Sequence, residues 1–222
     1  MTTALVTGAN KGIGLEIVKK LLATGMTVYL AARDAERGEK AAADTGARFL
    51  HLDVTDPKSI AAVRLDRLDV LVNNAGITGG SYQTPGAADL EKIREVFDTN
   101  VFGVIALTDA LLPLLRESAH ARIVNMSSTV GSLAGMATAE LPPSLAYLPS
   151  KTALNAVTVQ YAKAEPTIKI NAACPGYCAT DLNGHRGTRT AAQGADIAVT
   201  LATLGDDGPT GGFYDDNGVI AW

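Results

Sequence analysis

Residues 3–14 read TALVTGANKGIG. The first five form a short apolar run that suits a buried strand, and residues 15–23 then show helical periodicity. A glycine-rich turn between strand and helix lets backbone N–H groups approach a diphosphate, and the helix N-terminus adds a partial positive charge. The spacing Thr-Gly-x-x-x-Gly-x-Gly differs from the common Gly-x-Gly-x-x-Gly dinucleotide fingerprint, but the mechanics are the same. The stretch therefore predicts a phosphate-binding turn, with simple closure of a strand–helix connection as the alternative.

Strands alternate with helices along the rest of the chain. After the strand at residues 3–7, the pattern predicts strands at residues 26–31, 47–52, 69–72, 122–126, 168–173 and 212–214. Predicted helices follow at residues 35–43, 57–65, 88–96, 101–115, 152–164 and 191–204. This alternation predicts an α/β fold: a Rossmann-type doubly wound parallel sheet in three αβα layers, as a single domain over residues 1–222.

Composition narrows the class of protein. The 222 residues are 47% hydrophobic and 19% charged, which suits a soluble globular chain with one well-buried core. The net charge is −4 without a basic stripe, so no nucleic-acid partner is expected. No apolar run approaches about 20 residues, so neither a membrane span nor a signal peptide is expected. Cys174 and Cys178 fit reduced thiols in a cytoplasmic protein better than a metal or disulfide site, and no metal site is predicted.

The end of the second predicted strand bears on cofactor choice. In a dinucleotide fold, an acidic side chain here accepts from the adenosine ribose 2′-hydroxyl, whereas a basic one accommodates a 2′-phosphate. The strand ends in two alanines followed by Arg33, and Lys11 lies inside the glycine turn. Two cations converging on one phosphate favour NADP(H) over NAD(H). Asp34 could be the acidic contact, but we expect it to cap the next helix.

Further polar and small residues end other predicted strands. Asp53 follows the third, near the expected adenine position or as a plain turn residue, and Asn73-Asn74-Ala75-Gly76 ends the fourth. In an open parallel sheet such residues lie where a cofactor passes. Asn100 interrupts a long helical stretch, which is unfavourable unless its amide is used.

Tyr147 and Lys151 are four residues apart at the start of a predicted helix, and therefore share one face. Pro149 is compatible with a first helical turn. A nearby ammonium favours the ionised form of a phenol, whose ordinary pKa is about 10. The pair thus predicts a proton donor or acceptor near neutral pH, although the spacing alone is common in helices.

Taken in chain order, these motifs resemble the short-chain dehydrogenase/reductase family, and within it the carbonyl-reductase-like branch. The resemblance rests on Thr7-Gly8-x-x-x-Gly12-x-Gly14, Asn73-Asn74-Ala75-Gly76, Asn100, Ser128, Tyr147-x-x-x-Lys151, Pro175-Gly176, Ala32-Arg33-Asp34 and Trp222. It implies a catalytic tetrad of Asn100, Ser128, Tyr147 and Lys151. The implied cofactor-binding residues are Gly8, Asn10, Lys11, Gly12, Ile13, Gly14, Arg33, Asp53, Val54, Asn74, Ala75, Gly76, Tyr147, Lys151, Pro175, Gly176, Cys178 and Thr180.

The resemblance implies reversible reduction of a ketone or aldehyde by hydride transfer from NADPH. Tyr147 would supply the proton, while Ser128 donates a second hydrogen bond to the carbonyl oxygen. Lys151 would hold the nicotinamide ribose hydroxyls and lower the pKa of Tyr147. Asn100 would fix a water that connects Lys151 to solvent.

The chain departs from the family pattern in three segments. Residues 53–69 and the turn after the Tyr147 helix are shorter than usual, and residues 128–147 are longer than the commonest spacing. The last of these lines the substrate mouth. The expected substrate pocket is mostly apolar, which favours a hydrophobic carbonyl or alcohol substrate. Its residues are Leu133, Met136, Tyr177 and His185.

Two other functions fit parts of the pattern. A non-catalytic NADP-binding sensor or partner-binding module could share the fold, but it need not keep Ser128, Tyr147 and Lys151. A sugar-nucleotide epimerase or dehydratase needs a larger substrate domain after Tyr147 than this chain has.

Residues 153–159 are apolar nearly all round the helix, from which we hypothesise a homodimer through the Tyr147 helix.

Overall fold

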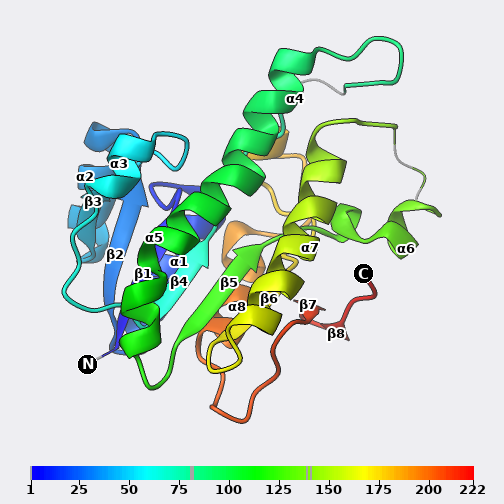
Figure 1. Cartoon of the computed structure of the whole chain (residues 1–222). Coiled ribbons are helices and arrows are strands. Elements are labelled where there is room, and N and C mark those ends of the chain that lie inside the picture. Colours follow the sequence, from blue (N-terminus) through cyan, green and yellow to red (C-terminus); the bar gives the residue numbers. More distant parts are fainter. Residues whose placement is uncertain (1, 81–82, 139, 141) are drawn as a thin grey trace.

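A computed structural model describes residues 2–80, 83–138, 140 and 142–222 (Figure 1). One eight-stranded sheet runs through it in the order β3-β2-β1-β4-β5-β6-β7-β8. The strands are β1 (Thr3–Thr7), β2 (Thr27–Ala32), β3 (Arg48–His51), β4 (Val70–Asn73), β5 (Arg122–Met126), β6 (Lys169–Ala173), β7 (Phe213–Asp215) and β8 (Gly218–Val219). Every pairing in this described sheet is parallel except β7–β8. The order reverses between β1 and β4, so the predicted doubly wound α/β fold is confirmed.

Helices cover both faces of the sheet. They are α1 (Gly12–Ala23), α2 (Ala35–Thr45), α3 (Pro57–Ala61), α4 (Leu90–Phe97), the π-helix η1 (Asp98–Phe102), α5 (Gly103–Glu117), the short turn η2 (Thr129–Gly131), α6 (Leu133–Met136), α7 (Tyr147–Ala164), the short turn η3 (Asp181–Asn183) and α8 (Ala191–Ala202). Buried side chains of α1, α2 and α8 form one core with the sheet. Those of α3, α5 and α7 form a second core on the opposite face, which gives three layers (Figure 1).

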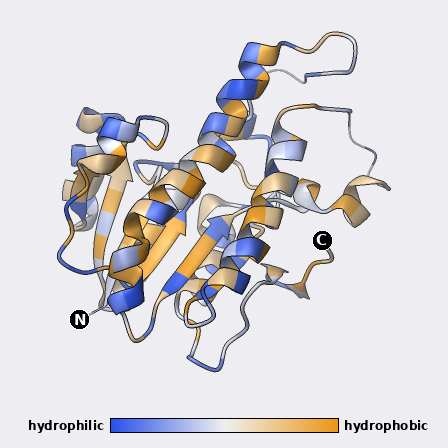
Figure 2. Cartoon of the chain, viewed as in Figure 1, coloured by the Kyte–Doolittle hydropathy of each residue, from blue (hydrophilic) through white to orange (hydrophobic). Residues whose placement is uncertain are grey.

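The central strands β1 and β4 are mostly apolar and buried, as expected where both faces of a sheet are covered (Figure 2). Successive side chains of a strand point to opposite faces. In β1, Ala4 and Val6 therefore join the core under α1, whereas Leu5 joins the core under α5. All three side chains are fully buried.

The longest helical stretch, Leu90–Glu117, joins α4, η1 and α5. By length and composition alone it is apolar enough to cross a membrane, but half of its most apolar window is buried inside the protein. Leu107, Leu111 and Leu115 pack in the core against the sheet. Its apolar face is thus used in packing on the sheet.

Aspartates set several helix starts. Asp34 accepts a hydrogen bond from the N–H of Arg37 at 3.0 Å, which confirms its predicted role as an N-cap. Asp89 caps α4, which therefore begins at Leu90, two residues later than predicted.

The helix predicted over residues 57–65 ends at Ala61. The loop expected after β5 contains η2 and α6, and β8 had no counterpart in the prediction.

Candidate active site

The glycine turn between β1 and α1 packs directly against the end of β4. Gly8 has a φ of +61°, and a Cβ there would lie 2.9 Å from the Cα of Ala75. At Gly14 a Cβ would lie 2.5 Å from the side-chain nitrogen of Asn74. Both positions therefore need glycine, the first for its backbone conformation and the second for close approach.

Side-chain hydrogen bonds hold this turn to the end of β4. The Nδ2 of Asn74 donates to the carbonyl of Thr7 at 2.8 Å and to that of Gly8 at 3.2 Å. In return, the hydroxyl of Thr7 accepts from the N–H of Asn74 at 2.9 Å and from that of Ala75 at 3.0 Å. These four hydrogen bonds fix the turn against the end of β4.

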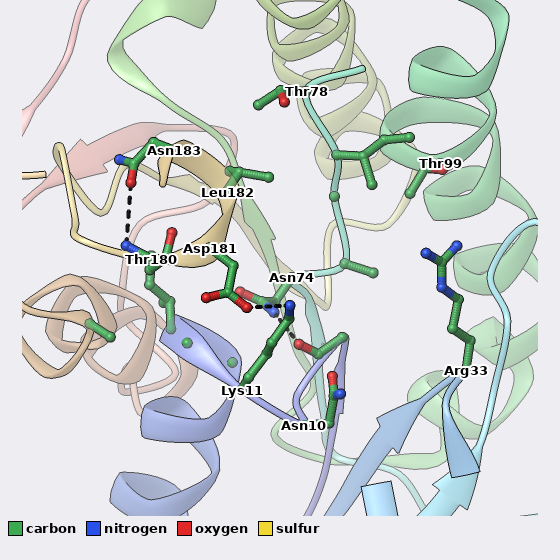
Figure 3. Close-up of a pocket in the computed structure, with 18 of the residues that line it drawn as sticks. Asn10, Lys11, Arg33, Asn74, Thr78, Thr99, Thr180, Asp181, Leu182 and Asn183 are labelled. Carbon is green, nitrogen blue, oxygen red and sulfur yellow. Dashed lines mark hydrogen bonds and ion pairs between the residues drawn. The ribbon is translucent and has the colours of Figure 1, made fainter. Parts of the chain in front are cut away.

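A cleft of about 990 Å³ opens over this turn at the carboxyl ends of the strands (Figure 3). Among the residues predicted for the cofactor, those that line it are Gly8, Asn10, Lys11, Gly12, Ile13, Gly14, Arg33, Asp53, Val54, Asn74, Ala75, Gly76 and Thr180. Those outside the lining are Tyr147, Lys151, Pro175, Gly176 and Cys178. The side chain of Cys178 is buried, and its thiol donates a hydrogen bond to the carbonyl of Pro175.

The two cations assigned to the 2′-phosphate do not converge in this structure. The Nζ of Lys11 lies 2.5 Å from the Oδ2 of Asp181, and the exposed Arg33 stands apart from it (Figure 3). Asp181 offers Lys11 an opposite charge in this structure, so the joint binding of a 2′-phosphate by Lys11 and Arg33 stays a prediction. The carboxylate of Asp34 is engaged by the backbone and guanidinium of Arg37, and these contacts lower its pKa.

The proposed catalytic pair begins α7. The Nζ of Lys151 lies 5.6 Å from the centre of the Tyr147 ring and donates to the carbonyl of Met126 at 2.8 Å. Lys151 is only 5% exposed, so its ammonium is held in a largely dry environment. The i, i+4 spacing thus places the two groups together, as predicted.

Burial controls the titration of both groups. It raises the pKa of Tyr147 to about 12, although a hydrogen bond with the Ser128 hydroxyl opposes the rise. Burial also lowers the pKa of Lys151 to about 8. The pKa of Tyr147 therefore moves opposite to the direction predicted from Lys151, because loss of solvation outweighs the hydrogen bond with Ser128. At neutral pH the phenol is protonated.

The loop after β5 holds Ser128 by buried polar contacts. The hydroxyl of Ser127 donates to the Oδ1 of Asn155 at 2.6 Å, and the Nδ2 of Asn155 donates to the carbonyl of Gly131 at 3.1 Å. The N–H of Gly131 bonds to the carbonyl of Ser128 at 2.8 Å. These contacts, which the sequence did not reveal, fix the backbone on both sides of Ser128.

Asn100 lies in the π-helix η1 and is fully buried. Its Oδ1 accepts from the N–H of Ile77 at 2.9 Å, and its Nδ2 donates to the carbonyl of Ile77 at 2.9 Å and to the Ser150 hydroxyl at 3.0 Å. The prediction that its amide is used is confirmed. A Cβ at Gly76 would lie 3.2 Å from Oδ1 of Asn100 and 3.6 Å from Nζ of Lys151, so the inner end of the cleft adjoins both groups.

Of the four residues predicted to form the substrate pocket, one lines the cleft and the other three do not. Leu133 and Tyr177 are 63% and 53% exposed, Met136 is half-buried on α6, and none of these three lines the cleft. His185 does line it, with its Nε2 2.7 Å from the Oδ1 of Asp181. Asp181 and Arg186 are charged residues of the cleft lining that were not predicted from the sequence. The only signal for Asp181 was its position directly after Thr180.

Comparisons with known proteins agree with this geometry. The family model described as short chain dehydrogenase matches residues 2–191. Salutaridine reductase of Papaver bracteatum is 34% identical over 293 aligned residues, which cover 97% of this chain and 94% of the relative. Carbonyl reductase (NADPH) 1 of Rattus norvegicus is 32% identical over 275 aligned residues, covering 99% of this chain and 98% of the relative. Both alignments are longer than the 222 residues of this chain, so these relatives contain residues that it lacks.

A solved structure extends the match to three dimensions. The NADPH-bound carbonyl reductase from chicken fatty liver superposes with a TM-score of 0.88 at 31% sequence identity. The superposition covers 100% of this chain and 99% of that one. The likeness therefore includes the cleft and the segments around it.

Proposed function

The chain belongs to the short-chain dehydrogenase family of oxidoreductases, and we propose that it reduces a ketone or aldehyde to an alcohol with NADPH, reversibly, as a single domain over residues 1–222. The observation that supports this proposal is that Tyr147 contacts both Ser128 and Lys151, while Lys151 lies beside Gly76 at the inner end of the cleft. The acid and the cation come from the start of α7 and the hydrogen-bond donor from the loop after β5, an arrangement that suits carbonyl reduction.

The cleft fits a dinucleotide by its own chemistry. The backbone of the glycine turn and the N-terminus of α1 suit the diphosphate. Arg33 and Lys11 supply positive charge for a 2′-phosphate, whereas Asp34, the acidic residue at the end of β2, is used in capping α2. These features favour NADPH, which also appears in the names of two relatives. When bound, NADPH supplies the hydride.

Tyr147 acts as the general acid in this proposal. Its raised pKa keeps the phenol protonated at neutral pH, which is the form required to donate a proton to the carbonyl oxygen. The Ser128 hydroxyl donates a second hydrogen bond to the same oxygen. Two donors aimed at one atom stabilise the negative charge that develops there.

Lys151 holds the cofactor ribose and renews the proton of Tyr147. An ammonium has three donors, of which one bonds to Met126, so two are available for ribose hydroxyls within the part of the chain described. Its pKa of about 8 allows proton exchange near neutral pH. Asn100 adjoins the same end of the cleft, and we place it in this relay through a water.

The proposal is tested by measuring the absorbance of NADPH, which falls as NADPH is consumed, in the presence of each member of a panel of ketones, aldehydes and quinones. Tyr147→Phe should reduce turnover by about 10²- to 10⁴-fold and leave NADPH binding near wild type. The matched control is Tyr161→Phe on the same helix, which removes a hydroxyl bonded to Asp109 and should retain turnover. Full turnover by Tyr147→Phe would refute the assignment. NADPH binding without turnover of any carbonyl would favour a non-catalytic sensor.

We also retain a homodimer through α7 and a cytoplasmic location as proposals. On the outer side of α7, Ala156 is exposed, and Val157 and Val159 are half-buried within one chain. A second copy could cover this apolar strip. A single species of monomer mass in light scattering would refute the dimer.

A further inference from the structure

The Lys11–Asp181 ion pair crosses the cleft. Lys11 comes from the glycine turn before α1, and Asp181 from the segment that follows β6 (Figure 3). Their charged atoms are 2.5 Å apart, and both side chains are about half exposed, at 52% and 53%. The pair therefore joins two walls of the site where a dinucleotide would lie.

Asp181 is not required for the shape of its own segment. The turn η3 is held by the N–H of Thr180, which donates to Asn183, and by the Nδ2 of Asn183, which donates to the carbonyl of Cys178 at 2.8 Å. The carboxylate of Asp181 instead faces Lys11 with one oxygen and His185 with the other. Lys11 and then His185 hold the pKa of Asp181 below its ordinary value, so it is charged at neutral pH.

Lys11 is thereby drawn away from Arg33. The guanidinium of Arg33 has no ion-pair partner among the described residues and stands on another part of the cleft wall (Figure 3). A phosphate bound by both cations would compete with Asp181 for the ammonium of Lys11. His185 would remain as a partner for the carboxylate left behind.

We propose that Asp181 is a cofactor-specificity residue, which competes with the 2′-phosphate of NADPH for Lys11. The inference rests on the proposed function, because it concerns the same cofactor. NADH has no 2′-phosphate and leaves the Lys11–Asp181 pair unchallenged, whereas the 2′-phosphate of NADPH competes with Asp181 for Lys11. Asp181 therefore reduces the preference for NADPH that Lys11 and Arg33 would otherwise give.

Removal of the Asp181 carboxylate should change the relative affinity for NADPH and NADH only modestly, since the Lys11–Asp181 pair is half exposed. Ion pairs of this exposure change equilibria by about two- to five-fold. Repulsion between Asp181 and the diphosphate acts equally on both cofactors. The informative quantity is therefore the ratio of the two dissociation constants rather than either one.

The test is a fluorescence titration of the full chain with NADPH and NADH. Asp181→Asn should lower the Kd for NADPH about two- to five-fold more than the Kd for NADH. The matched control is Asp196→Asn, which removes another exposed aspartate paired with a lysine of α1, Lys20, away from the cleft lining. It should leave both constants unchanged.

A second pair of variants isolates the route through Lys11. In a Lys11→Met background, Asp181→Asn should no longer change the ratio of the two constants. The inference would be overturned if Asp181→Asn alone left the ratio of the NADPH and NADH dissociation constants unchanged. It would also be overturned if Asp181→Asn changed this ratio equally in the Lys11→Met background. Either result would leave the proposed function intact. A wild-type chain that binds neither dinucleotide would refute the proposed function, and this inference with it.

Discussion

Arg33 is the residue whose removal should most change the choice between the two cofactors. It lines the cleft at the end of β2, is exposed, and has no ion-pair partner among the described residues. Its backbone carbonyl accepts a hydrogen bond from His51 at 3.0 Å, which truncation of the side chain leaves in place. Arg33→Ala should therefore act on the ligand rather than on the fold.

The size of the effect follows from the exposure of the site. A hydrogen bond to a charged partner contributes about 1.5–3 kcal/mol, and solvent in an open cleft weakens it toward the lower end. A loss of roughly 1–3 kcal/mol corresponds to an increase of about 5- to 150-fold in the Kd for NADPH. NADH carries no phosphate for this guanidinium, so its Kd should change less than about two-fold.

Titration of cofactor fluorescence at low and high salt measures this directly. The difference between wild type and Arg33→Ala should shrink at high salt, because an exposed pair is screened. The control is Arg48→Ala, an exposed arginine on β3 that lies over the Tyr29 ring and outside the cleft lining. Equal weakening of NADPH and NADH by Arg33→Ala would refute the 2′-phosphate argument.

Two predictions concern buried polar groups. Asn100→Ala removes a buried bond to Ser150 and two to the backbone, so thermal unfolding should show a loss of about 2–4 kcal/mol and turnover should fall with it; an unchanged Tm would contradict this. Asp69 is nearly fully buried, and hydrogen bonds from Arg67 and Ser118 outweigh its desolvation and lower its pKa. Its carboxylate therefore adds stability above an unfolded pKa of about 3.9, which is lost as pH falls through the lower folded value. Asp69→Asn should cost about 1–3 kcal/mol at pH 7 in urea unfolding, and this difference should shrink in acid; a pH-independent difference would contradict the linkage.

The sequence predicted most of the fold because its strongest signals are local. The glycine turn at residues 8–14 and the apolar strands around it depend on few distant contacts. Helix starts were predicted within a few residues, and the cap at Asp34 was identified from residue type alone. The hairpin of β7 with β8 was only half predicted, because β8 has two exposed residues and no alternating pattern.

The site was predicted in its parts but not in its electrostatics. Spacing on one helix was enough to bring Tyr147 and Lys151 together. The direction of the Tyr147 pKa depends on burial, which arises from the whole fold and not from residue spacing. The pairing of Lys11 with Asp181 joins residues far apart in the chain, so no local pattern could indicate it.

The central claim is that this chain passes hydride from NADPH to a carbonyl carbon while Tyr147 supplies the proton. The most direct measurement is reduction of a responsive carbonyl with NADPH deuterated at the nicotinamide C4, followed by mass spectrometry of the alcohol. We predict deuterium on the carbinol carbon with the wild type, and almost no product with Tyr147→Phe. Alcohol that forms without deuterium from either C4 position, or forms equally with Tyr147→Phe, would contradict the account.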